Sequence, residues 1–132
     1  MVFPNGSGIA AQLGDGLVLI RTDDGVSSMT SRACSDFGNE TRALGSTARV
    51  SDWRTVELDR RPRSLVLCTD GVGDDINPNE LASFTAWLVH EVRLEPTRRR
   101  HQTLARALRA WPTPHHVDDK TIAVCHVPNG VA

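Results

Sequence analysis

Short apolar runs separated by turn-forming residues dominate the first quarter of the chain, and this pattern predicts strands joined by tight turns. The expected strands are residues 1–3, 7–13, 17–21 and 26–29. The breaks between them are rich in glycine, proline, asparagine and aspartate: Pro4-Asn5-Gly6, Gly14-Asp15-Gly16 and Thr22-Asp23-Asp24-Gly25. Because strands with short connections pair with their neighbours in the chain, we expect a β-meander.

Three further strands are expected later in the sequence. Residues 30–51 are small and polar with no sustained period, which is typical of a surface loop. Residues 53–58 then alternate apolar and polar side chains, as in a strand with one buried face. Residues 64–69 and 121–127 are more continuously apolar, so both are expected to be buried strands.

Two helices are expected between the last two strands. Asn77-Pro78-Asn79-Glu80 combines an N-cap residue, a proline at the first helical position and a glutamate three residues after the cap. The apolar face of this first helix comprises Leu81, Phe84, Leu88 and Val92, with Trp87 on its flank. A second helix restarts at Pro96-Thr97, carries Leu104, Leu108 and Trp111 on one face, and ends before Pro112. The order of elements predicts an α+β fold of mainly antiparallel strands with two helices.

The composition of the 132 residues, with 39% hydrophobic and 23% charged side chains, fits one globular domain. A net charge of -1 gives no electrostatic case for a nucleic-acid partner, and Arg98-Arg99-Arg100 is interpreted as a solvated helix face. No apolar run is long enough for a membrane span, and residues 1–4 do not resemble a signal peptide, so we expect a cytoplasmic protein without a membrane partner. Of the three cysteines, Cys68 and Cys125 are expected to be reduced and buried in strands.

Carboxylates cluster directly after the expected buried strand at residues 64–69. Asp70, Asp74 and Asp75 are separated by Gly71-Val72-Gly73. Carboxylates this close repel each other unless a cation lies between them, and hard oxygen ligands favour Mg²⁺ or Mn²⁺ over zinc. A solvated Asp-Gly turn would use the same residues, so the position of other acids decides between the two interpretations.

Further acids lie at the ends of other expected strands. Asp15 occupies the turn between two strands, and Asp118-Asp119 precede the last one. If these strands share one sheet with residues 64–69, their carboxylates converge at one edge. The sequence then predicts a metal site there.

In order and context, the acidic segments resemble the metal-dependent protein serine/threonine phosphatases of type 2C, specifically their bacterial branch. The segments that carry the resemblance are Gly14-Asp15-Gly16, Asn39-Glu40-Thr41, residues 67–74 and Asp118-Asp119-Lys120-Thr121. The resemblance implies an α-β-β-α sandwich, and hydrolysis of phosphoserine or phosphothreonine in a phosphoprotein substrate. It also implies Mn²⁺ or Mg²⁺ as cofactors.

The resemblance assigns a role to each matched aspartate. In that family the residues matching Asp70 and Asp119 bind the second of two bridged metals, and those matching Asp15 and Asp74 hold a third. The attacking water is shared between two metals, so no catalytic residue beyond the metal ligands is expected. Around the ligands, rather than on a metal, we expect three further residues: Asp118, Asp75 and Gly71.

The family's site also uses an aspartate in an Asp-Gly-x-Gly-Gly segment, which bridges both metals, and an acidic motif nearer the N-terminus. This sequence contains neither motif, and Lys120 stands where the family usually has asparagine. We therefore expect residues 1–132 to form a single partial domain, the C-terminal half of the sandwich, with little phosphatase activity alone. The expected partner is a separate N-terminal half or a second copy of the chain in a homodimer.

Two other functions fit parts of the same sequence. A catalytically dead, phosphatase-like module that binds a phosphoprotein without hydrolysing it would carry the same motifs. Alternatively, His115-His116-Val117-Asp118-Asp119 offers the mixed nitrogen and oxygen ligands of a His/Asp metalloprotein of another class. In that case replacing the two histidines, and not Asp70→Asn, would abolish metal binding.

Overall fold

The structure, a computed structural model, describes residues 7–29, 49–111 and 118–126. Its strands are β1 (Gly8–Gln12), β2 (Leu17–Arg21), β3 (Val26–Met29), β4 (Arg54–Leu58), β5 (Ser64–Cys68) and β6 (Ile122–His126). Its helical segments are η1 (Val50–Asp52), α1 (Asp70–Gly73), η2 (Pro78–Glu80), α2 (Leu81–Leu94) and α3 (Thr97–Arg109). This combination of helices and antiparallel strands confirms the α+β class expected from the sequence.

The strands form two antiparallel sheets. One has four strands in the order β3-β2-β5-β6, and the other consists of β1 and β4. The expected meander is wrong at β1, which pairs with β4 so that Gly8 lies opposite Leu58. The physical reason is competition for edges: β3 and β5 already occupy both edges of β2, which leaves β1 no edge of its sequence neighbour.

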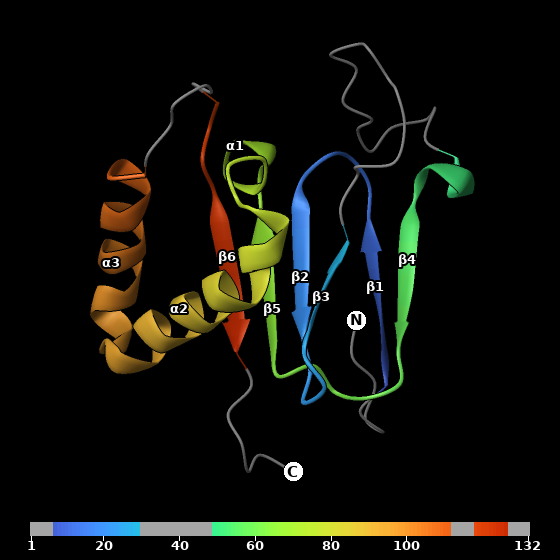
Figure 1. Cartoon of the computed structure of the whole chain (residues 1–132), viewed down its shortest axis with the longest axis horizontal. Helices are drawn as coiled ribbons and strands as arrows, with labels where there is room; N and C mark the ends of the chain where they lie inside the picture. The colour runs from blue at the N-terminus through green and yellow to red at the C-terminus, as the bar shows by residue number, and fades with distance from the viewer. Residues whose placement is uncertain (1–6, 30–48, 112–117, 127–132) are drawn as a thin grey trace.

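The long helices α2 and α3 lie over one face of the four-stranded sheet, whereas β1 and β4 lie to the side away from them (Figure 1). Between helices and sheet is the main core, formed by Leu17, Leu19, Val66, Cys68, Val72, Ile76 and Leu88. Leu81, Phe84, Leu104 and Leu108 pack against it, as their helical spacing predicts. The two long helices expected from the sequence are therefore confirmed.

A second, smaller core lies on the opposite face of β2, because successive strand residues point to opposite sides. It is formed by Ile20, Met29 and Leu58. Leu58 is the only buried residue of β4, and Val56 is 38% exposed, so the expected dry face of this strand is mostly open.

The face of the four-stranded sheet opposite α2 and α3 is also open over β5 and β6, where Leu67 is 50% exposed. Cys125 lies opposite Leu65 in the register and is exposed, so the expectation that it is buried is wrong. Cys68 points to the helical side and is buried as expected, and this burial raises the pKa of its thiol to about 12. The position of each thiol follows from strand alternation combined with helices on one side only.

The segment before α2 starts as its sequence predicts. The Asn77 side-chain oxygen accepts a hydrogen bond from the Asn79 N–H at 3.0 Å, and Pro78 is the first residue of η2, which leads into α2. Within the described ranges, no helix combines the length and apolar character that crossing a membrane requires.

Candidate metal centre

The helical turn α1 positions the first two predicted ligands, Asp70 and Asp74. The sequence predicts a loop here, but four residues form a single helical turn, with the Asp74 N–H donating to the Asp70 carbonyl at 2.9 Å. Residues four apart lie on one face of a helix, so α1 presents both carboxylates on the same side. An Asp70 carboxylate oxygen also accepts from the Gly71 N–H at 2.7 Å, which holds this side chain against the start of the turn.

Thr69 ties the segment that carries Asp119 to the end of β5. Its hydroxyl donates to the Asp119 carbonyl at 2.8 Å and accepts from the Thr121 N–H at 3.0 Å. Its backbone N–H donates to the Thr121 carbonyl at 3.1 Å. Three hydrogen bonds therefore fix the backbone around Asp119 beside Asp70.

Gly71 makes this close approach feasible. A Cβ at this position would lie 2.8 Å from the Asp119 carbonyl oxygen and 3.1 Å from the Asp118 Cβ. Both distances are shorter than ordinary contacts, so a side chain here would push the two segments apart. The structure thus places Gly71 against Asp118 and Asp119, and the role of Gly71 is steric. That these residues surround metal ligands stays a prediction.

The turn with Asp15 reaches the same edge through Gly16. A Cβ on Gly16 would lie 2.7 Å from the Cys68 carbonyl oxygen, so only glycine allows the start of β2 to approach the end of β5 this closely. The side-chain amide of Gln12, which is 7% exposed, donates to the Gly16 carbonyl and braces the turn from β1. The sequence does not predict this brace, because a buried glutamine in a strand carries no motif.

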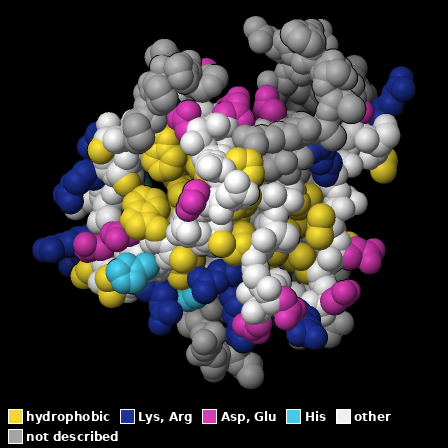
Figure 2. Space-filling view, viewed as in Figure 1, with side chains coloured by type: hydrophobic (Ala, Val, Ile, Leu, Met, Phe, Trp, Pro, Cys, Tyr) yellow, Lys and Arg dark blue, Asp and Glu magenta, His cyan; other side chains and the backbone are white. Residues whose placement is uncertain are grey.

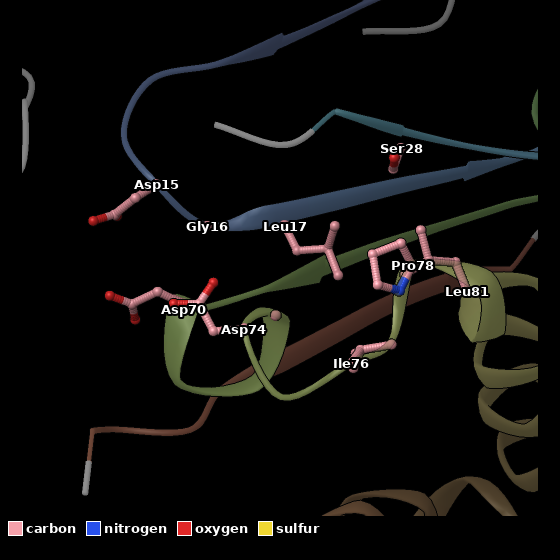
Figure 3. A pocket seen from close by; sticks show the side chains of 10 residues that line it. Asp15, Gly16, Leu17, Ser28, Asp70, Asp74, Ile76, Pro78 and Leu81 are labelled. Carbon is pink, nitrogen blue, oxygen red and sulfur yellow. The ribbon is translucent and has the colours of Figure 1, made fainter. Parts of the chain in front are cut away.

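Three of the predicted ligands line one hollow of about 330 Å³. Figure 3 shows Asp15, Asp70 and Asp74 at one end of it, and Leu17, Pro78 and Leu81 toward the other. Asp119 is exposed and is not part of the described lining of this hollow. Asp15 precedes β2, Asp70 and Asp74 follow β5, and Asp119 precedes β6. Three of the four strands expected to share one sheet therefore do so, while β1 belongs to the other sheet.

The donor chemistry of this edge suits a hard divalent cation, because its side chains offer carboxylate oxygens. The arrangement is incomplete: within the described residues, no three His, Cys, Asp or Glu side chains lie close enough together to hold a metal ion. The site as described therefore fits Mn²⁺ or Mg²⁺ in ligand type and not in ligand number.

Asp75 is directed away from this edge. Its carboxylate accepts a hydrogen bond from the Trp111 indole N–H at 3.1 Å, and the Trp111 ring meets Phe84 edge-on with centroids 5.9 Å apart. From the sequence, Asp75 is expected beside the ligands and Trp111 on the apolar face of a helix. In the structure the pair links the segment after α1 to the second residue after α3, and no sequence signal pointed to it because the two are far apart along the chain.

Other predicted site residues lie outside the described part of the chain. These are Asn39-Glu40-Thr41, which contributes to the resemblance, and His115 and His116, which carry the alternative metal site.

Comparison with known proteins identifies the family. The family model described as Protein phosphatase 2C matches residues 1–109, which include Asp15, Asp70 and Asp74. The chain therefore belongs to the protein phosphatase 2C family, and the resemblance inferred from the acidic segments is confirmed. The family is generally metal-dependent, and membership in it suggests a phosphatase hydrolase. Searches of curated proteins and of solved structures found no match.

Proposed function

We propose that this chain supplies the acidic edge of a phosphatase that hydrolyses phosphoserine and phosphothreonine in proteins, with Mn²⁺ or Mg²⁺ as the cofactor. The observation that carries the proposal is the steric fit that brings separate acidic segments together: Gly16 lies against the end of β5, and Gly71 lies against residues 118–119. Neither contact is required by a sheet alone. Both bring the backbones of acidic segments close together, and carboxylates on such segments are the ligand type that a hard divalent cation prefers.

The residues proposed to hold the cofactor are Asp70, Asp119, Asp15 and Asp74. When bound, divalent cations in this class of reaction supply an acidified water and offset the negative charge of the phosphoryl oxygens. The contribution of the chain itself is positional. Thr69 holds the Asp119 backbone in place, and α1 aligns two carboxylates on one face. Leu17 and Leu81 form an apolar end of the hollow beside them.

We further propose that a separate N-terminal half of the domain, or a second copy of the chain, covers the face of the sheet opposite α2 and α3. On that face Leu67 is 50% exposed, and Val56 of the neighbouring two-stranded sheet is 38% exposed. Apolar side chains on an uncovered sheet face favour association with another surface. Such a partner would also bring further ligands to the incomplete metal site.

The test is hydrolysis of a phosphothreonine peptide by the purified chain, with Mn²⁺ titrated in and EDTA as the blank. We expect slow turnover that requires Mn²⁺ and falls by about tenfold or more in Asp70→Asn and in Asp119→Asn. Asp70→Asn keeps a side-chain oxygen for the Gly71 N–H, so a loss would reflect charge rather than folding. The matched control is Asp59→Asn, an exposed aspartate in the turn after β4.

Turnover that persists in EDTA, or that is unchanged in Asp70→Asn, would refute the proposal. Binding of the phosphopeptide without any turnover, in the presence of Mn²⁺, would favour the catalytically dead module instead.

A further inference from the structure

A second hollow, of about 790 Å³, lies at the end of the four-stranded sheet opposite the aspartates. Topology places it there: Asp15 precedes β2 and Arg21 ends it, while Asp70 follows β5 and Arg63 precedes it. Figure 2 shows acidic side chains along the upper rim, and both basic and acidic side chains toward the lower edge.

Four arginines from four different segments line this second hollow. They are Arg21 of β2, Arg63 before β5, Arg93 of α2 and Arg100 of α3. Within the described lining there is one carboxylate, that of Asp23, and Arg63 engages it through two hydrogen bonds of 2.7 and 3.0 Å. The remaining three guanidinium groups therefore have no matching negative charge in the described part of the hollow.

The three other arginines keep donors available. Arg100 uses its Nε to donate to the Glu95 carbonyl at 3.1 Å, and this contact leaves its terminal amino groups unused. Arg21 and Arg93 form no ion pair with any residue in the ranges that the structure describes. Guanidinium groups are planar forks that bind tetrahedral oxyanions through paired hydrogen bonds.

His126 lies in the same hollow as these arginines. Its Nδ1 lies 3.1 Å from the Ser64 hydroxyl, which fixes the ring between β5 and β6. Burial, followed by the positive charges of Arg93 and Arg21, lowers the pKa of the imidazole, although a hydrogen bond with the Arg63 backbone opposes this. Two cations, from β2 and α2, thus act on His126, while the Asp23 carboxylate of the hollow is engaged by Arg63.

We propose that this hollow, between Arg21, Arg93 and Arg100, is a binding site for a phosphate oxyanion. The ligand is either inorganic phosphate or the phosphoryl group of a phosphorylated protein. The site is separate from the acidic edge, needs no metal and uses none of the residues proposed as metal ligands. It is independent of the proposed phosphatase function, because binding of the anion requires no turnover.

The experiment is isothermal titration of the whole chain at low ionic strength in the presence of EDTA. One arm uses inorganic phosphate, and the other uses a phosphoserine peptide with its unphosphorylated form as the blank. We expect saturable binding that is weakened about tenfold in Arg93→Gln, because one charge-assisted hydrogen-bonding group is lost. The matched control is Arg109→Gln, which makes the same change in charge. Arg109 is exposed in the last turn of α3 and is not among the described residues that line the hollow.

The His126 ring provides a second readout by proton NMR. Binding of the anion should raise the pKa of His126 toward its usual value in the wild-type chain, and in Arg93→Gln the same rise should require about tenfold more anion. Saturation by phosphate identifies the free ion as ligand, and saturation by the phosphopeptide alone identifies the phosphoryl group. No saturable binding in either arm, or an equal loss in Arg93→Gln and Arg109→Gln, would overturn the proposal.

Discussion

Gly71→Ala tests whether steric fit brings Asp119 beside Asp70. The added Cβ would lie 2.8 Å from the Asp119 carbonyl oxygen, so the backbone of residues 118–121 must move by several tenths of an ångström. This backbone is held by three hydrogen bonds to Thr69, of 2.8, 3.0 and 3.1 Å. Weakening two of them, at about 1 kcal/mol each, costs about 2 kcal/mol. The higher helix propensity of alanine offsets at most about 1 kcal/mol of this.

The assay is urea unfolding followed by circular dichroism. A net loss of about 1–2 kcal/mol, with an m value of about 1–2 kcal/mol/M, lowers the midpoint by about 1 M. Thr69→Val, which removes the hydroxyl that binds the same backbone, should lower it too. Because both changes release one segment, the double variant should be less destabilised than the sum of the two single variants. An unchanged or raised midpoint in Gly71→Ala, or strict additivity in the double variant, would refute the steric argument.

Three further predictions concern other parts of the fold. Trp111→Phe should lower the free energy of unfolding by about 1–2 kcal/mol, since it leaves the half-buried Asp75 carboxylate without its donor; equal urea midpoints would contradict this. Cys68 should resist alkylation at pH 8 until the chain unfolds, because burial raises its thiol pKa to about 12, whereas Cys125 should react at once; mass spectrometry of the labelled peptides distinguishes the two. The pKa of His126 is lowered in the folded state, so below pH about 6.5 the unfolded chain binds more protons than the folded one. The free energy of unfolding should therefore fall as the pH drops through the native pKa. In His126→Asn, thermal unfolding measured across this pH range should lose this part of the pH dependence.

Much of the secondary structure could be predicted from local signals. The cap at Asn77 and the spacing of Leu81, Phe84 and Leu88 locate α2 because capping and amphipathicity act within a few residues. The acidic segments could likewise be found, since each follows or precedes an apolar strand.

Other features depended on contacts between distant segments. The pairing of β1 with β4 follows from competition for the edges of β2, which no local pattern encodes. The turn α1 is too short to show a helical period. The arginine hollow draws its side chains from β2, α2, α3 and the loop before β5, so in the sequence these arginines look like separate surface charges.

The central claim is that this edge of the sheet holds a divalent metal through its aspartates. The most direct test is to titrate Mn²⁺ into the purified chain and to measure its binding by electron paramagnetic resonance. We expect Asp70→Asn and Asp119→Asn each to weaken binding by about tenfold or more, and Asp59→Asn to leave it unchanged. Mn²⁺ affinity that is unaffected by Asp70→Asn but abolished when His115 and His116 are both replaced would contradict the claim and move the metal to another site.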